Sequence, residues 1–169
     1  FHHDLVQAVE FAEHSMSLYQ AQNDQRGIAN ALRVLGMAAG DQGDYTRAVA
    51  LTEKCLRLNQ RIDNKLGIAD ALGRLGEVAC YQGDDRRARQ VWEESLAVAR
   101  DMGDRWRIAA ALKWLSFVAL NQDDAARARA LASESLVLNR ERGDRRQTGS
   151  SLFALALAMR LSRTVSNQS

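Results

Sequence analysis

The chain repeats itself every forty residues, and this period constrains its fold more than any other feature of the sequence. Written in rows of forty, the sequence aligns with no insertion or deletion. Columns of like residues include Asp24, Asn64, Asp104 and Asp144; Ala8, Ala48, Ala88 and Ala128; and Leu35, Leu75, Leu115 and Leu155. Self-similarity at a fixed period of this length is the signature of a protein built from stacked structural repeats.

Each repeat contains two segments with the periodicity of an amphipathic α-helix. In the first segment the apolar positions advance by four, three and four residues, as in Ile28, Leu32, Leu35 and Ala39. In the second they advance by three, four, three and four, as in Ala48, Leu51, Cys55, Leu58 and Ile62. These spacings place each set on one helix face. We name the two predicted helices A and B, and the absence of proline from the chain favours both.

Glycine followed by aspartate separates the helical segments at four places. These pairs are Gly43-Asp44, Gly83-Asp84, Gly103-Asp104 and Gly143-Asp144. Glycine can adopt the left-handed conformation that ends a helix, and the aspartate can cap the free N–H groups of the next one. The sequence therefore predicts helices of 16 to 18 residues joined by short turns.

The period predicts one all-α domain over residues 1–169 that begins and ends in mid-repeat. Its expected parts are a helix B at 4–22, full repeats at 25–64, 65–104 and 105–144, a helix A at 145–161, and a polar tail at 162–169. Because the chain lacks an initiator Met, we expect it to be a fragment or a processed form of a larger protein.

Residues 67–104 resemble a tetratricopeptide repeat of the longer, roughly 40-residue variety. The small residues that this family places in helix A are matched by Gly36, Gly76 and Ser116, and those in helix B by Ala48, Ala88 and Ala128 with Cys55, Ser95 and Ser135. The chain departs from the pattern because it lacks the proline at the repeat end and the bulky aromatic residues of shorter repeats. The resemblance implies a right-handed superhelical array of antiparallel helix pairs, an α-solenoid.

The same resemblance implies a function in binding. Arrays of this kind resemble sensor regions of bacterial signalling ATPases and transcription activators, so a protein- or peptide-binding scaffold in signalling or transcription regulation is the first hypothesis. The second is a small-molecule inducer-sensing domain of such a regulator, which a closed polar pocket near Arg74, Glu77 and Tyr81 would favour.

In this family the A helices line the concave groove that holds the ligand, so the polar and aromatic positions outside the packing stripe become the candidates. They are Asn30, Arg33, Met37, Asp70, Arg74, Glu77, Tyr81, Lys113, Trp114, Phe117 and Asn121. Two alternatives stay open for Trp114 and Phe117, which either anchor a partner in the groove or pack within the array.

The sequence offers no catalytic constellation, and we predict that the protein is not an enzyme and holds no cofactor. It lacks a phosphate-binding GxxxxGK[ST] loop, a GxSxG elbow, an HExxH motif and a CxxC motif. The three histidines, His2, His3 and His14, do not have metal-ligand spacing on a helix face, so no metal site is predicted. Two cysteines inside helices indicate a reduced protein and a cytoplasmic location.

Charge and hydropathy limit the partners. No apolar run reaches the roughly 20 residues of a membrane span. Residues 105–169 carry 11 Lys/Arg and 5 Asp/Glu, a charge of +6, but they lack the interleaved surface aromatics that stack nucleic-acid bases. The last helix is apolar nearly all round, from Leu152 to Met159. A terminal repeat needs a polar outer face, so either further repeats follow in a longer protein or this helix mediates homo-oligomer formation.

Overall fold

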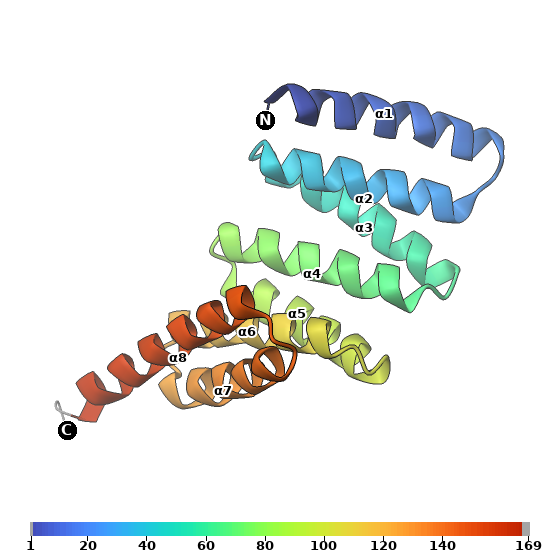
Figure 1. Cartoon of the computed structure of the whole chain (residues 1–169). Coiled ribbons are helices and arrows are strands. Elements are labelled where there is room, and N and C mark those ends of the chain that lie inside the picture. Colours follow the sequence, from blue (N-terminus) through green and yellow to red (C-terminus); the bar gives the residue numbers. More distant parts are fainter. Residues whose placement is uncertain (1, 167–169) are drawn as a thin grey trace. The chain divides into compact units, whose positions relative to one another are not determined.

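A computed structural model describes the backbone of residues 2–166 and the side chains of residues 6–160. The described chain consists of eight α-helices and contains no strand (Figure 1). The helices are α1 (His2–Ala21), α2 (Gln25–Asp41), α3 (Tyr45–Arg61), α4 (Lys65–Tyr81), α5 (Asp85–Asp101), α6 (Arg105–Asn121), α7 (Ala125–Glu141) and α8 (Arg145–Ser166).

The turns between helices repeat one structure. In the turn before α3, Gly43 has φ +79° and Asp44 caps the new helix by accepting a hydrogen bond from the Arg47 N–H at 3.0 Å. Three other turns place Asn23, Asp63 and Asp123 in the same left-handed region. Asn and Asp tolerate this conformation better than other non-glycine residues. Each helix therefore ends, and the next begins, within a few residues.

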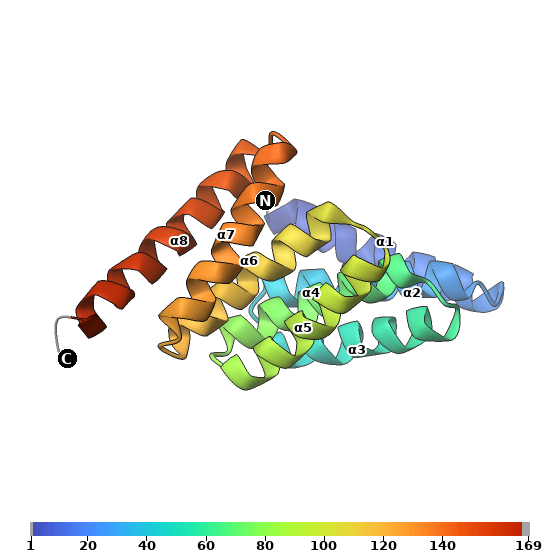
Figure 2. The same cartoon turned by 90° about the horizontal axis from the view of Figure 1, so that it is seen from below.

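The helices form two compact units, α1–α4 and α5–α8. In unit 1, α1 packs on α2, α2 on α3, and α3 on α4; α2 also contacts α4. In unit 2 the same order holds for α5 to α8, with a further contact between α6 and α8. Figure 2 shows α7 and α8 running side by side in unit 2. Neighbouring helices packed in pairs, with alternate helices also in contact, confirm the predicted all-α solenoid class.

The core of each unit is made from the repeated columns of small and aliphatic residues. Leu72 in unit 1 and Leu112 in unit 2 occupy the same column and are fully buried. Burial of one such side chain contributes about 1.5–3 kcal/mol. At Gly36 an added Cβ would lie 2.8 Å from Thr52 Oγ1, so only glycine lets α2 approach α3 this closely. The small residues are therefore needed for packing, as their columns predicted.

The last helix is longer than the sequence predicted. α8 continues to Ser166, whereas we expected it to end at 161 and a tail to follow over 162–169. Gly149 is the last glycine of the chain and no proline follows it, so nothing in the sequence ends the helix at 161. Residues 167–169 lie outside the described part. Of the helices described, none is long and apolar enough to cross a membrane.

Candidate ligand groove

A polar pocket of about 250 Å³ lies in unit 1, lined by α2, α3, α4 and the turn before α4. We call it the α2–α4 pocket. Three of the predicted groove residues line it, Asn30, Arg33 and Asp70. Its other polar side chains are Arg26, Asn59 and Asn64. The two A helices of unit 1, α2 and α4, thus bring three of the eleven predicted groove residues together.

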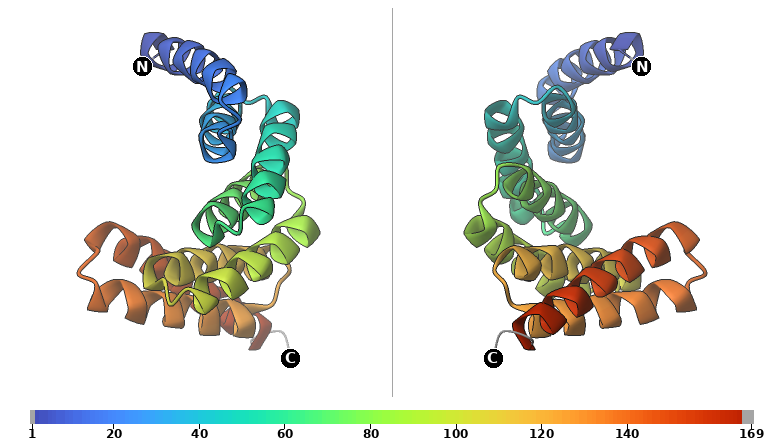
Figure 3. Two further views of the ribbon diagram at one scale, coloured as in Figure 1. Left: turned by 90° about the vertical axis from the view of Figure 1, so that its right-hand side faces the viewer. Right: turned by 90° about the vertical axis from the view of Figure 1, so that its left-hand side faces the viewer.

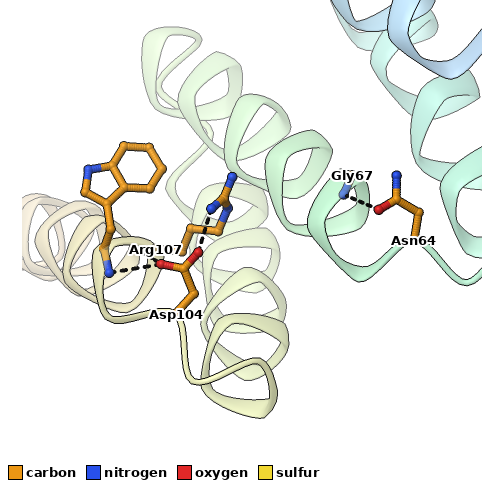
Figure 4. A network of polar contacts seen from close by, with 5 residues as sticks. Asn64, Gly67, Asp104 and Arg107 are labelled. Carbon is orange, nitrogen blue, oxygen red and sulfur yellow. Dashed lines mark hydrogen bonds and ion pairs between the residues drawn. The ribbon is translucent and has the colours of Figure 1, made fainter. Parts of the chain in front are cut away.

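The floor of this pocket depends on a close approach between Gly67 and Asn59. A Cβ at position 67 would lie 2.1 Å from Asn59 Oδ1, so no other residue fits there without displacing that side chain. Asn59 is buried; its Nδ2 donates to the Cys55 carbonyl at 2.9 Å, and its Oδ1 accepts from Asn64 Nδ2 at 2.8 Å. The Oδ1 of Asn64 in turn accepts from the Gly67 N–H at 3.3 Å (Figure 4). One side chain therefore both caps α4 and orients the buried asparagine.

The charges around the α2–α4 pocket favour an anionic or strongly polar ligand. Arg26 and Arg33 contribute two positive charges from α2, and Asp70 contributes one negative charge from α4, which leaves +1. Arg33 is exposed, and its Nη1 lies 3.3 Å from Met37 Sδ, a further predicted groove residue. A guanidinium on a flexible side chain at the mouth of a polar pocket can form paired hydrogen bonds with a carboxylate.

Cys55 lies at the bottom of the same pocket but lacks the properties of a nucleophile. Burial raises the pKa of its thiol, while Arg33 and the hydrogen bond from Asn59 act in the opposite direction and Asp70 raises it further. The raised pKa keeps the thiol protonated at neutral pH, and its Sγ donates to the Ala29 carbonyl at 3.2 Å. A protonated, buried thiol is a packing residue.

The predicted residues further along α4 lie outside the lining of the α2–α4 pocket. Arg74 and Glu77 form an ion pair at 3.0 Å on one helix face. Tyr81 is exposed and stacks on Tyr45, with ring centroids 6.2 Å apart. The α2–α4 pocket is thus lined by residues other than these three, which were the expected surroundings of a small inducer.

In unit 2 the predicted aromatic residues pack on the unit itself. Trp114 stacks on the buried Trp92 of α5 at 5.8 Å, and Phe117 meets Trp114 edge-on at 6.1 Å. Both Trp114 and Phe117 are half-buried. Lys113 Nζ lies 5.2 Å from the Trp114 ring, in a cation–π contact. Asn121, the last predicted residue, donates to Asp85 at 2.9 Å.

Side chains of unit 2 occupy the place that corresponds to the α2–α4 pocket. Shifted by two periods, Arg33 corresponds to Lys113 and Gly67 to Gln147. Lys113 Nζ donates to Gln147 Oε1 at 3.2 Å, which links α6 to α8 where unit 1 has its pocket. Beneath them the Ser135 hydroxyl lies 2.8 Å from the Ala109 carbonyl and 2.9 Å from Ser151 Oγ.

Sequence reasoning missed seven of the ten lining residues of this site, among them Arg26, Asn59, Asn64 and Gly67, which supply its other polar side chains and its floor. The available signal was the column next to the apolar stripe of helix B, which holds Asn59 and Asn139 but Tyr19 and Ala99 in the other rows. A polar residue that is buried beside this stripe needs a partner, and glycine in the next helix A gives it space.

No metal site is found in the part of the chain whose side chains are described. That part contains no group of three or more His, Cys, Asp or Glu side chains that could hold an ion. The side chains of His2 and His3 lie outside the described residues.

The helix packing defines an all-α helical-repeat protein. A family model described as "Tetratricopeptide repeat" matches residues 28–101, which contain α3, α4, α5 and most of α2. This match supports the tetratricopeptide resemblance, and repeats of this type generally mediate protein–protein interaction. Comparison with curated protein sequences found no match.

Two solved structures support the fold. The crystal structure of BtubC (BKLC) from P. vanneervenii superposes with a TM-score of 0.75 at 18% identity; the match covers 91% of this chain and 65% of that one. The chain thus spans just under two thirds of BtubC. The MamA RS-1 ArsTM double mutant superposes with a TM-score of 0.52 at 17% identity, with 93% and 96% of the two chains covered. Likeness at this level of identity concerns the fold alone.

Proposed function

We propose that the chain is a protein- or peptide-binding scaffold whose partner is anchored in the α2–α4 pocket of unit 1. The observation that carries this proposal is the convergence of Arg26, Arg33, Asn30 and Asp70 from two A helices on one polar pocket with a fixed floor. Such a surface offers both signs of charge and several amide groups to an extended chain.

The size of the pocket favours a side chain or chain end over a complete small ligand. Its volume is about 250 Å³. Sites for whole small molecules have volumes of about 300–1,000 Å³. An acidic side chain or a terminal carboxylate of a peptide would enter this pocket, while the rest of the peptide would lie along α2 and α4.

The same proposal extends to the kind of protein in which this chain would act. The resemblance to sensor arrays suggests a cytoplasmic bacterial regulator in signalling or transcription, in which this segment would recognise a partner protein. A small-molecule inducer is the second candidate, favoured by the polar lining of the α2–α4 pocket. Thermal unfolding measured with a panel of sugars and small carboxylates would support that candidate if one of them raised the melting temperature.

The test is selection from a random dodecapeptide library on the immobilised chain, followed by affinity measurement on the best peptide. Replacement of Arg33 by Gln removes a charged hydrogen bond worth about 1.5–3 kcal/mol, so affinity should fall at least tenfold. The matched control is Arg57→Gln on α3, where the exposed guanidinium pairs with Glu53 at 3.8 Å, outside the pocket. Equal affinities for the parent, Arg33→Gln and Asp70→Asn would place the ligand elsewhere and contradict the proposal.

A further inference from the structure

The outer face of α8 exposes an apolar column that is buried in the other A helices. Leu152 is 42% exposed and Met159 is 46% exposed, and Ala156 lies exposed between them. The same three columns are buried in the inner A helices, where they hold Leu32, Gly36 and Ala39; Leu72, Gly76 and Ala79; and Leu112, Ser116 and Ala119. At Gly36 the neighbouring atoms belong to Ala48, Leu51 and Thr52 of α3. In the inner repeats, the B helix that follows an A helix packs on this face. The open face of α8 is therefore the one that a following B helix would cover.

The first helix has the complementary open face. Phe11 is 70% exposed and Leu18 is 51% exposed on α1, which has the sequence pattern of a helix B. In the inner B helices these two columns are half-buried, and they hold Leu51, Val91 and Leu131, and Leu58, Val98 and Leu138. Leu51 and Leu58 pack against the cluster of Ala29, Leu32, Cys55 and Ala71, in which α2 supplies the preceding A helix. The open face of α1 is therefore the face that a preceding A helix covers.

A second pocket, next to the open face of α1, could hold one side chain of an A helix packed on that face. It has a volume of about 250 Å³ and lies between α1 and α2, with Ala8, Ala12, Ser15 and Ala31 in its lining. We call it the α1–α2 pocket. One repeat later, Leu32 packs against Cys55 and Ala71, which correspond to Ser15 and Ala31. Leu152 is the α8 residue in the column of Leu32, so it has the position and size to fill the α1–α2 pocket.

Charge favours the same pairing. Helix α1 contains three acidic residues and no Lys or Arg, and α8 contains four Arg and no acidic residue. With histidine neutral, the two helices carry −3 and +4. Glu13 of α1 already pairs with Arg47 of α3 at 3.6 Å, which leaves Asp4 and Glu10 as the remaining acidic residues of the helix. Opposite charges of this size steer encounter and disfavour α8–α8 or α1–α1 pairing.

We propose that the chain binds a second copy of itself head to tail, with α8 of one copy packed on α1 and α2 of the next. Leu152 enters the α1–α2 pocket, and the two helices complete one A–B pair between molecules. The contact joins two different surfaces, so each copy retains one free surface of each kind. Association continues beyond a dimer, into a ring or an open chain of copies. Asn30 lines both the α1–α2 pocket and the α2–α4 pocket, but the charged residues Arg26, Arg33 and Asp70 line only the second of these two. The test of the contact needs no peptide.

The experiment measures molar mass by light scattering on the 169-residue chain over a concentration series. The mass should rise past that of two copies of the 18.8 kDa chain. Leu152→Glu on α8 and Phe11→Glu on α1 should each give monomers, and both replace exposed side chains, so circular dichroism should show unchanged helix content. The matched control is Val137→Glu, because Val137 is an exposed apolar residue of α7 outside both faces; its mass should equal that of the parent.

Mixing the two monomeric variants gives the decisive result. Leu152→Glu retains an intact α1 surface, and Phe11→Glu retains an intact α8 surface. Their mixture should therefore form a complex of one copy of each and grow no further. A parent chain that is monomeric at every concentration would overturn the proposal. So would a dimer that survives Phe11→Glu but not Leu152→Glu, because that pattern identifies α8 pairing with α8.

Discussion

Units 1 and 2 use the same columns of the repeat and differ in what they leave open. Between α2 and α4, Gly67 and Arg33 leave room for the α2–α4 pocket, whereas Gln147 and Lys113 meet between α6 and α8. Figure 3 shows α2–α4 and α6–α8 from two sides, each set built from three consecutive helices. The comparison teaches that packing columns shared by all repeats set the fold, while a few columns that differ between repeats decide whether a pocket forms between two A helices.

The largest effects are expected in the shared core. Leu72→Ala in unit 1 and Leu112→Ala in unit 2 should each lower the free energy of unfolding by about 2–5 kcal/mol, because both remove a fully buried side chain and leave a cavity. Urea unfolding followed by circular dichroism measures both. Closely similar losses would confirm that the two units share one core design, and a loss in only one of them would break the comparison.

The next effect concerns the pocket floor of unit 1. Gly67→Ala should destabilise the chain by about 1–3 kcal/mol, because the new Cβ displaces the Asn59 amide from its hydrogen bonds. Gly149→Ala is the matched control: this helical glycine has no atom within 4 Å of the added Cβ. It should be neutral or gain up to about 1 kcal/mol from helix propensity. A tolerated Gly67→Ala would show that the floor is not fixed as described.

A reciprocal exchange compares the two buried asparagines. Asn139 Oδ1 is buried and accepts no hydrogen bond from the described residues, whereas the equivalent Asn59 Oδ1 accepts one from Asn64. The column of Asn64 holds Asp144 in unit 2, which has no amide to donate. Asp144→Asn should therefore gain about 0.5–1.5 kcal/mol, and Asn64→Asp should lose about as much. Unfolding free energies that move in the same direction for both changes would contradict this account.

The smallest effect is a pH dependence at the start of α6. Burial acts to raise the pKa of Asp104, but hydrogen bonds from the Arg107 N–H and guanidinium, the Arg107 charge and the Trp106 N–H outweigh it and hold the pKa below its usual 3.8 (Figure 4). A carboxyl with a lowered pKa stabilises the fold fully above its unfolded pKa and loses that contribution as pH falls through the folded pKa.

Asp104→Asn tests this dependence. The cap one repeat earlier, before α4, is Asn64, which does not titrate, so the variant gives α6 the same kind of cap. Asn and Asp cap about equally well, so the parent should be the more stable protein at pH 5 only through the charge of Asp104 at the helix N-terminus, by about 0.3–1 kcal/mol. The difference should shrink as pH falls towards 2. A difference independent of pH would show that the Asp104 charge contributes nothing.

The fold was predictable because every repeat encodes it in the same columns. Four aligned caps, buried leucines at Leu72 and Leu112, and small residues such as Gly36 recur at fixed spacing, so a single sequence acts as its own alignment. The predicted end of the last helix was wrong, because no further repeat supplies a column for comparison there. Helix α8 continues past residue 161, since no helix breaker follows Gly149.

The site was only partly predictable because it depends on differences between repeats. Asn30, Arg33 and Asp70 were placed from the helix A stripe, and they line the α2–α4 pocket. The Asn59–Gly67 contact joins a helix B to the next helix A and could not be read from either stripe alone. The packing of Trp114 likewise depends on Trp92, which stands in a column that holds Thr52 and Ala132 elsewhere.

The central claim is that a ligand enters unit 1 through the α2–α4 pocket. The most direct test is a two-dimensional nitrogen–proton NMR titration of the side-chain amides with a peptide selected from the library. The account predicts shifts for Asn30, Asn59 and Asn64, which line the pocket, and none for Asn139 and Gln147 at the corresponding place in unit 2. Shifts confined to Asn139 and Gln147, or absent from all five amides while the peptide binds, would contradict it.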